Sequence, residues 1–92
     1  MLHLVAYDIA NPRRLRKVAK ICEDYGVRME RSVFECDLDD GQMSVFWGRL
    51  GEAVDPDEDR VIDYCIGKLE RQKIRRLGNV DASSEADAIL VL

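Results

Sequence analysis

The segment LVAYDIANPRR (residues 4–14) spans the junction between a strand and a helix, and the fold can be worked outward from it. A short apolar run is followed at once by Asn-Pro, which predicts a strand over residues 2–9. Asn11 is a good N-cap, and Pro12 suits the first position of the helix that follows. A single carboxylate, Asp8, stands in the apolar run just before the strand ends, and its presence there needs an explanation.

Both faces of this predicted strand carry apolar residues, so we expect both to be covered. Successive side chains of a strand point to opposite faces, which assigns each residue to one of two sets. One face carries Leu4, Ala6 and Asp8, and the other carries Val5, Tyr7 and Ile9.

The first helix is predicted to have one apolar and one basic stripe. Apolar residues recur at helical spacing until Gly26, which supplies a C-terminal stop. Four cations fall on the opposite stripe and predict a basic face that points outward. The apolar stripe is Leu15, Val18, Ala19, Cys22 and Tyr25, and the basic stripe is Arg13, Arg16, Lys17 and Lys20.

Four more segments have the composition of strands. Residues 27–38 are rich in β-branched and aromatic residues and predict one long strand, and residues 60–66 alternate in polarity. Residues 73–77 predict a weaker strand, and residues 88–92 (AILVL) a terminal apolar one. The alternation in 60–66 places Ile62, Tyr64 and Ile66 on one face.

A second helix is predicted after the turn DLDDG (37–41), which contains a capping Asp. Its apolar stripe, which includes the only Trp of the chain, is expected to lie in the core. The stripe is Met43, Phe46, Trp47, Leu50 and Val54.

This order of elements predicts the α+β class and a ferredoxin-like βαββαβ sandwich, an antiparallel sheet with two helices on one face. We expect one domain over residues 1–92, with a core over 1–78 and a loop and C-terminal strand over 79–92 at a dimer interface. The two apolar faces of the first strand and the spare apolar strand at the C-terminus both favour a homodimer.

Composition restricts the function classes. No stretch approaches the ~20 apolar residues that span a bilayer, and the N-terminus is a poor signal peptide, so a cytoplasmic protein without membrane contact is expected. The three cysteines lack metal-ligand spacing and are predicted to be core residues in a reducing cytosol. His3 is expected to be structural and lies on the strand face opposite Asp8.

The net charge of −4 is unevenly distributed along the chain. Residues 10–31 contain seven Lys/Arg and three acids, whereas residues 32–59 contain nine acids and one Arg. A local basic zone is compatible with a polyanionic partner, although a solvated mixed-charge surface would have the same composition.

Four landmarks now stand in a fixed order: YDI (7–9), the basic helix, YGVRMERSVFE (25–35) and DRVIDY (59–64). Together they resemble the small CRISPR-associated endoribonuclease family, the Cas-two proteins of spacer acquisition. The resemblance covers roughly residues 1–78. Glu30 departs from it, because the family usually has Gln there, and this departure makes a phosphate contact at that position doubtful.

The resemblance implies a ferredoxin-like homodimer that binds RNA or duplex DNA and cleaves phosphodiester bonds. Asp8 would meet its symmetry mate across the two-fold axis and hold Mg²⁺ there, as catalytic and metal-binding residue. The resemblance also implies integrase subunits (Cas-one proteins) as partners in spacer integration, and a C-terminal strand that packs on the partner subunit.

A metal between two copies of Asp8 fits the physics of the position. Two ionised carboxylates would repel each other, and a divalent cation between them removes this repulsion. The ion would polarise a phosphate and activate a water. The alternative is a carboxylate that only caps the turn before the helix at Pro12.

Several other residues are candidates for contacts with nucleic acid. Arginines suit phosphates because the planar guanidinium donates two hydrogen bonds at once, and aromatic rings stack on unpaired bases. Each has a structural alternative: Arg28 pairing with Glu30 or Glu35, Phe34 in the sheet core, and Tyr7 packing against its neighbours. The candidates are Arg13, Arg14, Arg16, Lys17, Arg28, Tyr7 and Phe34.

These observations leave several functions open. The first is a magnesium-dependent endonuclease of CRISPR antiviral defence, and the second a non-catalytic adaptor that holds duplex DNA and bridges integrase subunits. A small-molecule regulatory domain of the same architecture is disfavoured by the basic helix and the SVFE motif (32–35), and a toxin ribonuclease of related fold matches the motifs less well.

Overall fold

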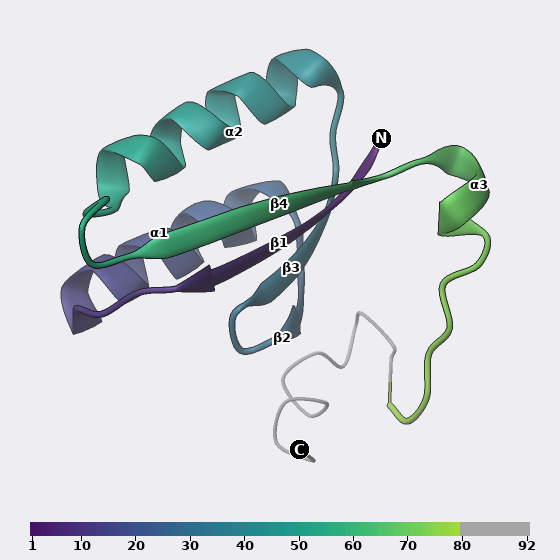
Figure 1. Ribbon diagram of the computed structural model, residues 1–92, viewed down its shortest axis with the longest axis horizontal. Helices are drawn as coiled ribbons and strands as arrows, with labels where there is room; N and C mark the ends of the chain where they lie inside the picture. Colours follow the sequence, from purple (N-terminus) through teal and green to yellow (C-terminus); the bar gives the residue numbers. More distant parts are fainter. Residues whose placement is uncertain (80–92) are drawn as a thin grey trace.

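The computed structural model describes residues 1–79, which form a four-stranded antiparallel sheet and three helices (Figure 1). The strand order is β2-β3-β1-β4, so β1 is a central strand and β4 an edge strand. Chain order gives β1 (Leu2–Asp8), α1 (Pro12–Tyr25), β2 (Val27–Glu30), β3 (Val33–Asp37), α2 (Asp40–Ala53), β4 (Arg60–Ile66) and α3 (Lys68–Arg71). The predicted α+β class and βαββαβ fold, an antiparallel sheet with two helices on one face, are confirmed.

One hydrophobic core joins α1 and α2 to the same face of the sheet. Val5 and Tyr7 of β1 are buried in this core together with Val18 of α1 and Phe46 of α2. The opposite face, to which Asp8 belongs, is not covered by either long helix. The predicted assignment of side chains to the two faces of the first strand is therefore confirmed.

Side-chain caps begin both long helices where the sequence predicts them. The Asn11 side chain accepts hydrogen bonds from the backbone N–H groups of Arg13 and Arg14, directly before Pro12. Asp39 and Gln42 form a reciprocal capping box at the start of α2. These caps fix where the chain leaves the sheet.

The single long strand predicted over residues 27–38 is wrong, because the chain reverses within it. β2 and β3 pair antiparallel as a hairpin, with the turn at Arg31 and Ser32 and an irregular register beside it. The Ser32 carbonyl accepts a hydrogen bond from the Tyr7 backbone N–H, which ties the turn to β1. Ser32 is the only turn-forming residue type in this turn, and its preference is weaker than that of Gly, Pro, Asn or Asp, so the local composition gave little signal.

The strand predicted over residues 73–77 is also wrong. The chain there follows α3 without regular structure, and two ion pairs hold it, Arg71 with Asp37 and Arg76 with Glu35, each at 2.8 Å. The strand predicted over residues 88–92 lies outside the described residues.

Three residues predicted to lie in the core are exposed instead. Trp47 and Leu15 are 42% and 40% exposed, because each lies at the margin of its helix's apolar stripe. Cys65 is exposed, whereas Cys22 and Cys36 are buried as predicted, and burial raises their thiol pKa values to about 12 and about 11. No helix among residues 1–79 is long and apolar enough to cross a bilayer.

Asp59 ties together the loops at one end of the β1/β4 pair. Its side chain is fully buried and accepts hydrogen bonds from the backbone N–H groups of Ala10, at 3.0 Å, and Asp55, at 2.8 Å. The Arg14 guanidinium donates to both of its oxygens, at 2.8 and 3.2 Å, and also to Glu58. The hydrogen bonds from Arg14 lower the pKa of the Asp59 carboxyl well below its ordinary value.

We expect Asp59→Asn to lower the midpoint of thermal unfolding by roughly 5–15 °C, because it breaks a buried charge-assisted network. Since the folded-state pKa is depressed, the carboxylate stabilises the fold above the unfolded pKa of about 4 and loses this effect as the pH falls towards the folded value. Calorimetry between pH 3 and 7 should therefore show wild-type stability falling in acid more steeply than that of Asp59→Asn. Asp57→Asn, an exposed acid of the same loop, is the matched control, and equal behaviour of the two variants would contradict this role.

Candidate functional site on the open face of the sheet

Asp8 is the last residue of β1, and its side chain is exposed on the sheet face that α1 and α2 leave uncovered. It makes no hydrogen bond or ion pair with any other described residue. The turn-capping alternative is not observed, because Asn11 caps the helix and Asp59 binds the Ala10 N–H. A free carboxylate at a strand end is available to an external ligand.

Asp8 has one cationic neighbour, and the residues further along the same sheet face are mainly apolar. In the antiparallel register Asp8 lies directly opposite Arg60 of β4, so the two side chains point to the same face. The next pair on this face is Ala6 with Ile62, and the following one places Tyr64, 55% exposed, opposite Leu4. The alternation in residues 60–66 predicts the face of Ile62 and Tyr64, but only the register shows that Arg60 stands beside Asp8.

A single chain supplies only part of a metal site. Among residues 1–79 no three His, Cys, Asp or Glu side chains are grouped so that they could hold a metal ion. His3 is buried on the helix-covered face, where its Nδ1 donates a hydrogen bond of 2.9 Å to Asp63. A cation bound at Asp8 would therefore need further ligands from water, substrate or a second copy of the chain.

The basic stripe of α1 is exposed, as its spacing predicts, and none of its four cations forms an ion pair within the described residues. By contrast, Arg14 is committed to Asp59 and Glu58, which removes it from the set of phosphate-binding candidates. The free cations are Arg13, Arg16, Lys17 and Lys20.

Arg28 is half-buried and already has partners. Its guanidinium lies 3.5 Å from Glu23 and 5.2 Å from the centroid of the Phe34 ring. Neither Glu30 nor Glu35, the two predicted partners, forms this pair, because Glu23 approaches it from α1 and Glu35 binds Arg76. Arg28 therefore has less freedom to bind a phosphate than the stripe on α1.

The aromatic candidates Tyr7 and Phe34 lie in the core, so base stacking through them has no exposed ring to use. Phe34 is 0% exposed and stacks on Tyr7 with ring centroids 6.2 Å apart. The Tyr7 hydroxyl donates to the Arg31 carbonyl oxygen at 3.3 Å, and burial raises its pKa. The aromatic side chain available on the open face is that of Tyr64.

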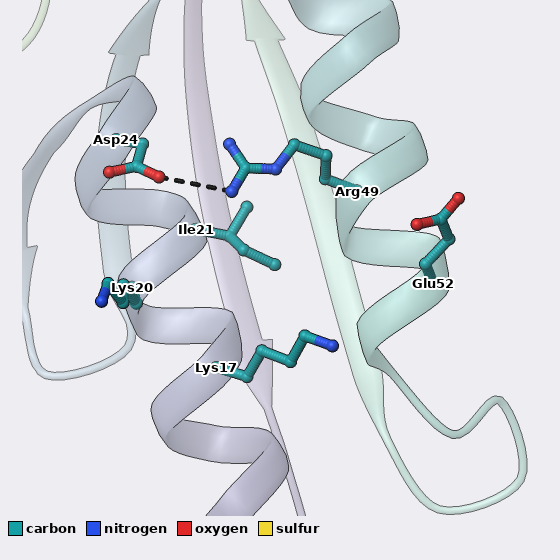
Figure 2. Close-up of a pocket in the computed structure, with 6 residues that line it drawn as sticks. All are labelled: Lys17, Lys20, Ile21, Asp24, Arg49 and Glu52. Atoms are coloured by element: carbon teal, nitrogen blue, oxygen red, sulfur yellow. Dashed lines mark hydrogen bonds and ion pairs between the residues drawn. The ribbon is translucent and has the colours of Figure 1, made fainter.

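A charged groove of about 260 Å³ separates α1 from α2 on the helix side of the molecule. Figure 2 shows Lys17 extending from α1 towards α2, and Arg49 reaching from α2 to Asp24. That ion pair measures 3.3 Å. The groove is lined by Lys17, Lys20, Ile21, Asp24, Arg49 and Glu52.

The candidate residues thus lie in two layers. Asp8 and Arg60 are on the open face of the sheet, whereas the free cations of α1 are in the helix layer behind it (Figure 1). Within one chain, the residue best suited to hold a metal and the residues best suited to bind a polyanion therefore lie on different surfaces.

Comparison with known proteins identifies the same family that the motifs resemble. Residues 1–74 match the family described as CRISPR associated protein Cas2. The chain is 39% identical over 83 residues to the CRISPR-associated endoribonuclease Cas2 of Nitratidesulfovibrio vulgaris, which covers 85% of this chain and 81% of the relative. It is 36% identical over 83 residues to the CRISPR-associated endonuclease Cas2 of Halalkalibacterium halodurans, with 85% and 86% covered.

Solved structures show the same similarity. The Cas2 crystal structure from Streptococcus pyogenes superposes with a TM-score of 0.75 at 37% identity, covering 85% of this chain and 100% of that one. A hypothetical protein from Thermus thermophilus gives a TM-score of 0.70 at 35% identity, covering 72% and 80%. The matched span contains Asp8, the α1 cations and the DRVIDY motif, and the chain belongs to the Cas2 family of CRISPR-associated proteins.

Proposed function

We propose that the protein is a magnesium-dependent endonuclease of CRISPR antiviral defence that takes part in the acquisition of new spacers. The observation that carries this proposal is the exposed, unpartnered carboxylate of Asp8 on the open sheet face. Relatives named endoribonuclease and endonuclease support the reaction class. We propose single-stranded RNA, duplex DNA or both as substrates; the name endoribonuclease supports RNA.

The open face favours a homodimer in which two copies of Asp8 share one Mg²⁺. Exposed side chains on the same sheet face as Asp8, such as Ile62 and Tyr64, would gain stability when a second copy covers them. One carboxylate is a weak ligand for Mg²⁺, which prefers oxygen ligands and keeps several waters. A second Asp8 and the substrate phosphate would complete the set of protein and substrate oxygens.

The reaction expected at this site is hydrolysis of a phosphodiester. The metal, when bound, supplies Lewis-acid polarisation of the phosphate and a more acidic water. In the net reaction the oxygen of one water forms a bond to phosphorus, the bond to the leaving oxygen breaks, and that oxygen takes up a proton. Asp8 holds and orients the cation, and the apolar neighbours exclude bulk water from it.

We expect Asp8→Asn to lower magnesium-dependent cleavage of labelled single-stranded RNA at least about 100-fold, because the amide keeps the shape but loses the charge that holds the cation. The assay compares both proteins with magnesium and with EDTA, and duplex DNA is tested in parallel. Asp57→Asn is the control for loss of a negative charge elsewhere. Equal cleavage by wild type and Asp8→Asn would rule out the proposed site.

The second function that a specific observation favours is that of an adaptor holding duplex DNA and bridging integrase subunits. Four unpaired cations on one helix face, in the layer opposite to Asp8, suit a phosphate backbone without bringing it to the carboxylate. An α-helix rises 1.5 Å per residue, so Arg13 and Lys20 lie about 10 Å apart along it. That length matches two to three successive phosphates of one strand. The adaptor and nuclease roles use different surfaces and are compatible.

We expect the double variant Arg16→Gln/Lys20→Gln to bind duplex DNA more weakly and with a shallower salt dependence. Each lost phosphate contact should flatten the slope of log K against log salt by about 0.9, and hence by about 1.8 per protomer. Anisotropy titrations between 50 and 300 mM KCl measure the slope. Lys68→Gln, an exposed cation without an ion pair in the described residues, is the control, and an unchanged slope in the double variant would exclude α1 as the duplex-binding surface.

A further inference from the structure

The motif DRVIDY (59–64) begins with two adjacent charged residues whose surroundings differ. Asp59 is buried and fully hydrogen-bonded, whereas Arg60 is exposed and forms no hydrogen bond or ion pair with any described residue. We infer that Arg60 contacts the substrate in the Asp8 site, where its guanidinium binds the non-bridging oxygens of the phosphate that is cleaved. This inference rests on the proposed nuclease function.

The sheet register places Arg60 beside Asp8. The two residues form the last pair of the β1/β4 ladder and point to the same open face. Side chains paired in this way start about 5 Å apart at Cβ, which is close enough for an ion pair. They nevertheless form none in the structure, which leaves both groups available to bind the same ligand.

Asp59 has the geometry of a positioning residue for this pair. Its carboxylate binds the N–H of Ala10, two residues after Asp8, and it directly precedes Arg60 in the chain. The Arg14 side chain closes the same network from α1. The end of β1 and the start of β4 are therefore held together by one buried carboxylate, and this holds Asp8 and Arg60 side by side.

The charges alternate in the order that phosphodiester hydrolysis needs. Asp8 would hold the cation, which would polarise the phosphate, and the guanidinium of Arg60 beside Asp8 would neutralise the charge that builds up on the phosphate oxygens. Arginine suits this role better than lysine because its planar fork donates two parallel hydrogen bonds to one phosphate and stays charged at every working pH. Arg60 makes or breaks no bond and keeps its protons throughout.

The test compares Arg60→Gln and Arg60→Lys with wild type, Asp8→Asn and Arg75→Gln. Arg75 is a matched control, an exposed arginine that follows α3 in the chain and has no ion pair in the described residues. Three quantities are measured for each protein: kcat and KM on single-stranded RNA with magnesium, Mn²⁺ affinity by titration, and binding of the same RNA with and without Mn²⁺, followed by stopped-flow anisotropy before cleavage begins.

We expect Arg60→Gln to lower kcat about 100-fold while KM changes less than about threefold, as for loss of one donor to developing charge. Arg60→Lys should recover roughly a tenth of wild-type kcat. Mn²⁺ affinity should be unchanged or slightly higher in Arg60→Gln, and RNA binding with and without Mn²⁺ should stay within about threefold of wild type, in line with the small change in KM. Arg75→Gln should resemble wild type in all three measurements.

The outcomes separate this inference from the proposed function. If Asp8→Asn is inactive while Arg60→Gln is fully active, the role of Arg60 is overturned and the proposed function stands. Cleavage that survives Asp8→Asn overturns both. Weaker Mn²⁺ binding in Arg60→Gln, or full rescue by lysine, would also overturn the inference, because the arginine would then support the metal site or supply only a point charge.

Discussion

The constraint on which the structure depends is the alternation of side chains along β1, a central strand whose two faces meet different surroundings. One face packs against both long helices, through Val5 and Tyr7, and supplies the middle of the core. The other face ends in Asp8 and lies on the open side of the sheet. A slip of one residue would exchange the two sets and bury the carboxylate beneath the helices, at a high cost in free energy for an unpaired charge. The position of Asp8 is therefore a consequence of core packing.

This division into two layers would allow the metal chemistry and the polyanion binding that we propose to coexist in a chain of 92 residues. The four cations of the basic stripe, Arg13, Arg16, Lys17 and Lys20, have no carboxylate partners among the described residues. Arg14, Arg28 and Arg49, by contrast, bind acids of the same chain. The free cations of the α1 basic stripe thus lie on a surface separate from Asp8. A protein built in this way can hold a duplex on its helices and, as we propose, cleave a phosphodiester on its sheet.

The Asp59 network connects these layers at one end of the molecule. It joins the loop after β1, the first turn of α1 and the loop before β4 through a single buried carboxylate. Such a junction makes the relative placement of Asp8 and Arg60 a property of the fold, independent of any ligand. It also links the stability of the protein to the geometry of the proposed site, because loss of the network loosens both strand ends together.

Local sequence determined the features that depend on neighbouring residues. The period of two in β1, the Asn11 cap, the basic stripe of α1 and the Asp39 cap were all predictable, because each follows from short-range hydrogen bonding or periodicity. The motifs also predicted the family, which the comparisons confirm. The strand order, by contrast, and with it the pairing of Asp8 with Arg60, joins residues about fifty positions apart, and no local pattern encodes it.

Only the tertiary structure decided which candidate side chains are free to bind a ligand. Tyr7 and Phe34 have the composition of stacking residues but are needed to fill the core, and Arg14 is bound by an acid 45 positions away. The turn at Arg31 and Ser32 has only one weak turn-forming residue, Ser32, and its position follows from the pairing of β3 with β1 and β2. The physical reason is common to all of these cases: burial and ion pairing are settled by long-range contacts, whereas caps and periodicity are settled within a few residues of the chain.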